Sequence, residues 1–213
     1  MKDIYRLGVE GHSKIKTAIL KSTYRGPFII IGGAGSLHLR TGKQLCDANG
    51  FAYKWPDAHL DYMRARMLDH GQRGFSTFIY LFKWARSNYQ NPGWFSWLGR
   101  MFAWLFHVFA KKTLTDPDAI GLILCSRIAL SMWEGVNDVQ WSFLSPPWLL
   151  RDKGLRTGRY EIHIDKDEGS EEAGIYGGIY NEDMAVAIVD EVETRKLTHV
   201  HWTCTGPIGL KHW

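Results

Sequence analysis

Two short apolar runs, each ended by a tight turn, constrain the fold of this chain more than any other feature. Phe28–Ile31 is β-branched at three of four positions and stops at Gly32-Gly33-Ala34-Gly35-Ser36. Val139–Leu144 is closed in the same way by Ser145-Pro146-Pro147. Continuous apolar runs of this length are typical of buried strands in a parallel sheet. We therefore expect the two strands to lie side by side and point the same way, with their exits forming a shared pocket.

The rest of the chain alternates helices and strands over a length, 213 residues, that suits one domain. Helices are expected at 3–24, 57–69, 116–133 and 180–193, and strands at 160–164 and 175–179, interpreted as a hairpin, and at 200–204. Asp183 lies in the first turn of the last helix, where the helix dipole stabilises an acid. The alternation favours an α/β fold with a largely parallel sheet.

Residues 71–115 depart from this pattern because they are rich in aromatic side chains. Positions 94–110 read WFSWLGRMFAWLFHVFA and end at Lys111-Lys112. As a helix this run would be about 25 Å long. It could be a helical insert that buries its aromatics on the domain or on a second subunit. It could equally be a lid over an apolar ligand, or an interfacial helix that contacts a membrane surface through 94–112.

Composition excludes several classes of protein. The net charge of +4 is thinly spread, so nucleic acid is not an expected partner. Cys46, Cys125 and Cys204 are few and far apart, which argues against a disulfide scaffold and favours a reducing, cytoplasmic location. His199-x-His201 lacks a third ligand at suitable spacing, so no metal site is expected. The polar N-terminus and the lack of a long apolar run predict neither a secretory signal nor a membrane-spanning helix.

Four ordered segments carry a family resemblance: IIIGGAGSL (29–37), DVQWSFLSPP (138–147), GLRTGRY (154–160) and YNEDMAVAIVDEVE (180–193). They resemble the C-terminal half of the NAD(P)H-binding, NmrA-like branch of the atypical short-chain dehydrogenases/reductases. The resemblance covers 1–67 and 116–205. It implies one Rossmann-like domain over 1–213, with the helical insert at about 71–115. It also implies an NAD(P)H-dependent oxidoreductase that acts on a small apolar or aromatic carbonyl-like compound.

The family's first strand and its GxxGxxG turn have no counterpart in this sequence. In that turn, glycines let the backbone approach the pyrophosphate at a helix N-terminus. The chain is therefore expected to be either a shortened product of an NAD(P)H-binding parent or a reduced protein that has lost dinucleotide binding. Without those strands a sheet edge is exposed, at 28–31 or at 139–144. The aromatic insert or a second subunit would cover it, which favours a homo-oligomer.

The resemblance places three candidate catalytic residues. Ser36 stands where the wider superfamily has a Ser or Thr that hydrogen-bonds the substrate carbonyl; it could also simply cap the turn. Tyr62 and Arg66 form Tyr-x-x-x-Arg, which is similar to the superfamily's Tyr-x-x-x-Lys, where a cation lowers the pKa of the phenol. The same spacing also arises by chance on a helix.

The remaining candidates are binding residues. The resemblance places Gly33, Ala34, Gly35, Ser145, Pro146 and Pro147 near the cofactor and Arg156 and Arg159 near the substrate, and Tyr53, Lys54 and Trp55 could line the same substrate cleft. The two arginines could hold an anionic substrate or a phosphate. Equally, the prolines could only stiffen a loop and the arginines could only hold a surface turn.

Three hypotheses about function follow. The first is the NAD(P)-dependent oxidoreductase just described. The second is a cofactor-independent isomerase, dehydratase or cyclase, in which Ser36, Tyr62 or an imidazole handles protons. The third is a non-catalytic remnant that only binds a small ligand or a partner.

Overall fold

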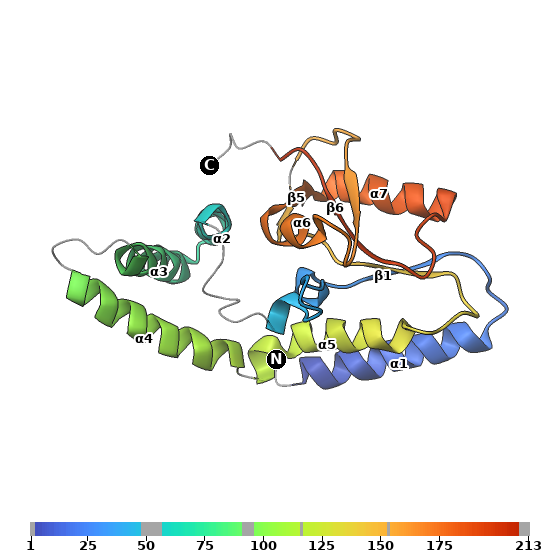
Figure 1. Ribbon diagram of the computed structural model, residues 1–213, viewed down its shortest axis with the longest axis horizontal. Helices are drawn as coiled ribbons and strands as arrows, with labels where there is room; N and C mark the ends of the chain where they lie inside the picture. Colours follow the sequence, from blue (N-terminus) through green and yellow to red (C-terminus); the bar gives the residue numbers. More distant parts are fainter. Residues whose placement is uncertain (1–2, 48–56, 91–95, 116, 153, 209–213) are drawn as a thin grey trace. The chain divides into compact units, whose positions relative to one another are not determined.

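The computed structural model describes residues 3–47, 57–90, 96–115, 117–152 and 154–208 (Figure 1). The chain forms two compact units. The first comprises Met1–Asn49 and Ile120–Gly209, and the second comprises Gly50–Ala119 and Leu210–Trp213. The second unit contains the segment at 71–115; its origin as an insert in one larger domain stays a prediction.

A four-stranded sheet organises the first unit. Its strands, in spatial order, are β1 (Phe28–Ile31), β2 (Trp141–Leu144), β6 (His201–Thr205) and β4 (Glu161–Ile164). β1, β2 and β6 are parallel, and β4 is antiparallel to β6. Phe28 pairs with Trp141 and Ile31 pairs with Leu144. The predicted parallel pairing of the two apolar runs is therefore confirmed, as is the mostly parallel α/β architecture.

Helices cover both faces of this sheet (Figure 1). On one face α1 (Ile4–Lys21) and α5 (Pro117–Trp133) lie over a core made of Ile30, Ala129, Leu130, Trp133, Trp141 and Phe143. On the other face α7 (Asn181–Thr194) packs on Leu144, Ile179, Ala187, Leu197, Trp202 and Cys204. Phe143 and Leu144 join different cores because successive side chains of a strand point to opposite faces.

The segment between β4 and α7 differs from the sequence expectation. The predicted strand at 175–179 is wrong at its start, because α6 (Ser170–Tyr176) runs into it and only β5 (Gly178–Tyr180) is extended. Glu171 and Glu172 occupy the first turn of α6, where acids favour a helix. The predicted hairpin is also wrong: β4 pairs with β6, and β5 pairs in parallel with β3 (Leu149–Arg151), a strand not expected from the sequence.

β1 is an edge strand of the described sheet. Only Ile30 is buried in it, and Ile31 is 55% exposed. The expectation that Phe28–Ile31 is buried throughout is therefore wrong, because no strand of the described residues flanks β1 on its outer side. The exposed edge that the sequence places at this strand or at 139–144 lies at β1. β2, which is internal, is buried at all four positions.

The second unit consists of helices in its described part. α2 (Asp57–Asp69), α3 (Arg73–Gln90) and α4 (Ser96–Thr115) pack around Leu60, Ile79 and Phe82. One side of α4 carries a row of exposed apolar side chains: Trp97, Met101, Trp104, Leu105 and Val108. Within the described residues, no helix is both long enough and apolar enough to span a bilayer.

Candidate functional site

The exits of β1 and β2 form a pocket of ≈ 460 Å³. Gly32 extends the pairing by donating its N–H to the Leu144 carbonyl over 2.8 Å, and a 3₁₀ turn, η1 (Ala34–Ser36), follows. The pocket is lined by His12, Ile31, Gly32, Gly33, Ala34, Gly35, Ser36, Cys125, Ser126, Pro146, Pro147, Trp148 and Leu150. Its volume falls within the range of about 300–1,000 Å³ that is usual for small-ligand sites. The shared pocket expected from the sequence is present.

The glycines of this turn have separate roles. A Cβ on Gly32 would lie 2.3 Å from the ring of Phe143, so glycine is needed there to pack the turn on β2. A Cβ on Gly33 would meet only the Ser126 hydroxyl, at 3.9 Å. Gly33 therefore leaves room in the pocket instead of filling it, and a bound ligand can approach the backbone there.

A chain of short polar contacts leads from the pocket into the sheet. The Ser36 hydroxyl lies 2.9 Å from that of Ser145 and 2.7 Å from the Gly33 carbonyl. The Ser145 hydroxyl lies 2.8 Å from His201 Nε2, and His201 Nδ1 lies 2.8 Å from Asp165 Oδ2. Ser36 and Ser145 are 1% and 0% exposed. The parallel strands produce this chain, because Ser36 follows β1, Ser145 follows β2, and His201 opens β6.

Asp165 is the anchor of the chain. His38 Nδ1 also contacts Oδ2, at 2.6 Å, and the His38 backbone N–H donates to Oδ1 at 2.8 Å. Burial alone would raise the pKa of Asp165, but the hydrogen bonds and positive charge of His201, with the bonds from His38, outweigh it and lower that pKa to about 2. The ionised carboxylate only accepts hydrogen bonds, so both imidazoles donate to it through Nδ1.

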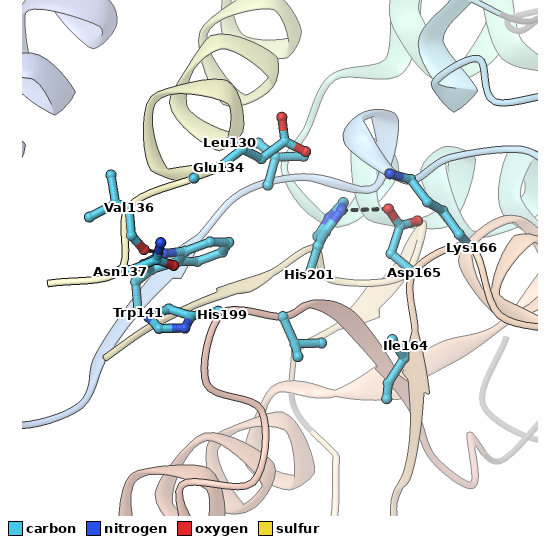
Figure 2. Close-up of a pocket in the computed structure, with 12 residues that line it drawn as sticks. Leu130, Glu134, Val136, Asn137, Trp141, Ile164, Asp165, Lys166, His199 and His201 are labelled. Atoms are coloured by element: carbon cyan, nitrogen blue, oxygen red, sulfur yellow. Dashed lines mark hydrogen bonds and ion pairs between the residues drawn. The ribbon is translucent and has the colours of Figure 1, made fainter. Parts of the chain in front are cut away.

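Asp165 and His201 also line a second pocket, of ≈ 390 Å³ (Figure 2). Figure 2 shows them joined across the pocket wall, with Lys166 beside Asp165. His199 lies at the other end, and its Nε2 is 2.8 Å from the Val139 carbonyl. The two histidines of the His-x-His pattern therefore contact different groups: His199 contacts the Val139 carbonyl, and His201 contacts Ser145 and Asp165.

The Asp165 cluster also contains a donor set suited to a divalent metal ion. One ligand atom from each of His38, Asp165 and His201 lies within 4.8 Å of the others. Tetrahedral Zn²⁺ would hold a nitrogen and an oxygen about 3.3 Å apart. The observed contacts of 2.6 and 2.8 Å are those of hydrogen bonds. As arranged, the cluster is a hydrogen-bonded network, and an ion could bind only if these nitrogen and oxygen atoms moved apart.

The structure brings together most of the predicted cofactor residues. Gly33, Ala34, Gly35, Pro146 and Pro147 line the pocket together with Ser36, while Ser145 lies directly behind Ser36. Their roles stay predictions.

Arg156 and Arg159 lie outside the lining of the β1–β2 pocket and are exposed. Arg159 lines a separate pocket of ≈ 290 Å³. The turn between them is held by the fully buried Asp183, whose carboxylate accepts bonds of 2.8 Å from Thr157 N–H, Thr157 O–H and Gly158 N–H. The interpretation of Asp183 as a helix-end acid overlooked this contact between α7 and the turn.

Other predicted residues fall elsewhere. Tyr62 and Arg66 belong to α2, in the second unit, whereas Ser36 belongs to the first. Tyr53, Lys54 and Trp55 lie outside the described residues.

His38 and Asp165 were missed by sequence reasoning, and His201 was noticed only as half of a metal pattern. The signal that could have found His201 was its place at the start of the strand expected at 200–204, in a sheet expected to be largely parallel. Asp165 and His38 are separated by 127 positions, so no local pattern connects them.

No family model and no curated protein matches the chain. Solved structures share its fold, among them the following three. A candidate exported protein from Burkholderia pseudomallei has 21% identity over 94% of this chain and a TM-score of 0.54. A candidate NADH-flavin reductase from Streptococcus pneumoniae TIGR4 has 17% identity over 97% and a TM-score of 0.55. A candidate epimerase from Bacteroides thetaiotaomicron has 20% identity over 96% and a TM-score of 0.54.

These neighbours are longer than this chain, which spans 65%, 67% and 63% of their respective lengths. At such identities the likeness concerns the fold alone. It shows that the chain has a mixed α/β, Rossmann-like fold, in agreement with the sequence expectation.

Proposed function

We propose that this chain is an NAD(P)-dependent oxidoreductase-like protein of the atypical short-chain type, acting on a small apolar or aromatic carbonyl-like compound. The observation that carries the proposal is the pocket at the carboxyl ends of β1 and β2. In open α/β sheets, ligands bind outside the carboxyl ends of parallel strands. Two fold neighbours bear the names of a candidate NADH-flavin reductase and a candidate epimerase, which supports this choice of chemistry.

The pocket fits the nicotinamide end of such a cofactor better than its phosphates. Gly33 leaves space beside the backbone, and Pro146, Pro147 and Trp148 provide flat apolar walls for a planar ring. None of the described residues that line this pocket is Lys or Arg, so the phosphates would have to be held elsewhere. A bound nicotinamide would supply a hydride to the carbonyl carbon. Ser36 would donate a hydrogen bond to the carbonyl oxygen and polarise it.

Titration with NADPH tests the proposal, because Trp148 lines the pocket and its fluorescence reports occupancy. We expect saturable quenching that is strongly reduced in Trp148→Phe, while calorimetry shows that this variant still binds. Absence of heat and of quenching in protein with an intact far-UV spectrum would contradict nucleotide binding.

A cofactor-independent enzyme that moves protons is the second candidate function. It is favoured by the link between Ser36 and an imidazole, and by the lack of cationic side chains in the described pocket lining. The test follows hydrogen–deuterium exchange next to the carbonyl of small ketones in D₂O, without nucleotide. Exchange that depends on Ser36 would support this candidate, and exchange equal to the background would count against it.

We also propose that α4 contacts an anionic membrane surface. Its exposed row ends in Trp97 and Val108, and the run from 94 to 115 contains Arg100, Lys111 and Lys112 but no acid. Aromatic residues beside cations suit the lipid headgroup region. Cys46, Cys125 and Cys204 are all free thiols, which supports a reducing compartment such as the cytoplasm.

A further inference from the structure

The polar chain from Ser36 to Asp165 can run in two directions. The Ser145 hydroxyl has one proton and two neighbours that can take it, Ser36 at 2.9 Å and His201 Nε2 at 2.8 Å. Asp165 fixes the other end, because an ionised carboxylate accepts the N–H at His201 Nδ1. The state of Nε2 therefore decides the direction of every hydroxyl in the chain.

Both directions satisfy the buried groups. With neutral His201, Ser36 donates to Ser145 and Ser145 donates to Nε2. With His201 as imidazolium, Nε2–H donates to Ser145, Ser145 donates to Ser36, and Ser36 donates to the Gly33 carbonyl at 2.7 Å. The two states differ by one proton and leave no hydroxyl proton of the chain without an acceptor.

We propose that Ser36, Ser145, His201 and Asp165 form a proton relay that serves the β1–β2 pocket, with Ser36 as the group that touches the ligand. The chemistry of the relay rests on the proposed function, whether in its reductase or its proton-transfer form. The relay needs no movement of the backbone, because only hydroxyl rotations and short proton shifts separate the two states.

In the reductase form the relay would deliver a proton to the carbonyl oxygen of the ligand as negative charge develops there, and a bound reduced nicotinamide would supply the hydride. The Ser36 O–H bond breaks and an O–H bond forms on the ligand. Ser36 takes the proton of Ser145, and Ser145 takes the proton of His201 Nε2. One proton has then passed from imidazolium to product, leaving neutral His201. After product release, a hydronium ion from solvent gives one proton to the same chain, which restores the imidazolium and leaves water.

Asp165 acts as a positioning residue in this scheme. It holds the Nδ1–H tautomer of His201 and stabilises the imidazolium, the two tasks of the acid in a serine–histidine–aspartate triad. His38 binds the same carboxylate and restrains it from the other side. Ser145 is fully buried and does not line the β1–β2 pocket, so a ligand in that pocket touches the relay only at Ser36.

Nitrogen-15 NMR of the histidine rings in the full chain tests the relay without any substrate, with His201→Gln assigning the signal. We expect Ser36→Ala to move the His201 titration curve to lower pH by about 0.5–1 unit, because the Ser145 proton loses its acceptor in the imidazolium state. In a Ser145→Ala background the same substitution should have no effect. Ser142→Ala is the matched control: it alters the same strand at a hydroxyl that lies 3.3 Å from Trp202 Nε1.

Two titratable groups, Asp165 and His38, lie next to His201. Three more line the ≈ 390 Å³ pocket that His201 also lines: Glu134, Lys166 and His199. All of them remain in the compared variants, so differences between variants isolate the relay. If Ser36→Ala leaves the His201 curve unmoved, or if Ser142→Ala makes the curve insensitive to Ser36, the relay is wrong.

A second experiment separates the relay from the proposed function. With NADPH and a panel of small aromatic aldehydes and quinones, Ser145→Ala and His201→Gln should lower kcat by about 10²–10⁴ and change its pH profile, and His201→Gln should leave NADPH affinity unchanged. His199→Gln, two residues before β6 begins, should match the wild type. Turnover with an unaltered pH profile in His201→Gln would overturn the relay and leave the oxidoreductase standing. NMR coupling without NADPH binding would retain the relay and overturn the oxidoreductase.

Discussion

Asp165 receives two imidazole contacts on the same carboxylate oxygen, and this has a consequence for stability. Its pKa is about 2 in the folded chain, against an ordinary value near 3.9. The Asp165 carboxylate is therefore protonated at higher pH in the unfolded chain than in the folded chain. Its ionisation stabilises the fold fully only above about pH 4. This contribution falls as the pH drops towards 2.

We expect Asp165→Asn to be less stable than the wild type by about 2–3 kcal/mol at pH 6. The difference should shrink as the pH falls from 5 to 2, because the wild-type carboxylate becomes neutral. Denaturant unfolding of both proteins across this range measures it. Asp167→Asn is the control, on an exposed neighbour. A difference between Asp165→Asn and wild type that is constant with pH would contradict the assignment of the charge.

The individual site residues divide according to how local their signals are. Ser36 and Ser145 were predicted from the family resemblance, which rests on turns that each follow an apolar strand, and the parallel pairing brings their hydroxyls together. Asp165 has no such signal: it follows a half-exposed strand and gains its role from His201 and His38, which are distant in sequence. Long-range pairing of this kind is a property of the fold and is not encoded in any short pattern.

The close contact between α1 and α5 depends on Gly8, which has no side chain. A Cβ on Gly8 would lie 2.2 Å from Cys125 Sγ and 3.2 Å from its Cβ, whereas a Cβ on Gly11 would have nothing within 4 Å. Both glycines lie within the same helix, so they share its backbone geometry and differ in surroundings.

We expect Gly8→Ala to lower the free energy of unfolding by about 1 kcal/mol or more, because overpacking outweighs the better helix propensity of alanine. Gly11→Ala should raise it by about 0.5–1 kcal/mol. Thermal and denaturant unfolding measure both. Cys125→Ala should relieve much of the cost in the Gly8→Ala background, and a failure to do so would show that this contact is not the cause.

The exposed row on α4 leads to a prediction about lipid binding. Trp97 is 65% exposed and Trp104 is 63% exposed. Replacing both with Ser should weaken binding to phosphatidylserine-containing vesicles by about tenfold or more. Binding to pure phosphatidylcholine should be weaker for every variant, and salt should reduce the difference. Tyr176→Ser, which removes an aromatic side chain that is 64% exposed on the first unit, is the control. Equal sedimentation of all variants with vesicles would refute the proposal.

Element predictions succeeded where periodicity and end signals agree. The helix at 3–24 was expected from apolar residues at helical spacing and a Gly-Pro stop, and the helix at 116–133 from its Asp-Pro start and Gly135 stop; they are observed as α1 and α5. The segment at 170–180 failed because Ile175 and Tyr176 favour a strand locally, while the acids before them start a helix that ends only at Gly177. Residues that favour a strand therefore follow closely on residues that favour a helix, and tertiary packing decides which structure forms.

At the scale of the whole molecule, the outer side of β1 is the open feature of the first unit. Phe28 N–H donates to Gln140 and Gly32 N–H to Leu144, so the intervening alternation points the N–H groups of Ile29 and Ile31 away from β2. An edge of this kind can pair with a second copy, and a two-fold axis would make that pairing antiparallel.

We expect the wild-type chain to dimerise with increasing concentration in sedimentation velocity, and Ile31→Pro to stay monomeric. Proline removes a donor that does not serve the β1–β2 ladder, so the fold should be retained. Ile31→Val keeps the donor and should dimerise like the wild type. A Pro variant that dimerises normally would exclude β1 as the contact.

The close contact between α1 and α5 at Gly8 also affects the size of the ligand that the first unit can bind. His12 of α1 and both Cys125 and Ser126 of α5 line the β1–β2 pocket. The spacing of the two helices therefore sets the width of the opening above the strand ends. A bulkier residue at position 8 in a related chain would part the helices and admit a larger molecule, leaving the strands and their hydroxyls untouched. Related chains with this fold can therefore accept ligands of different size while keeping the same hydroxyls for proton transfer.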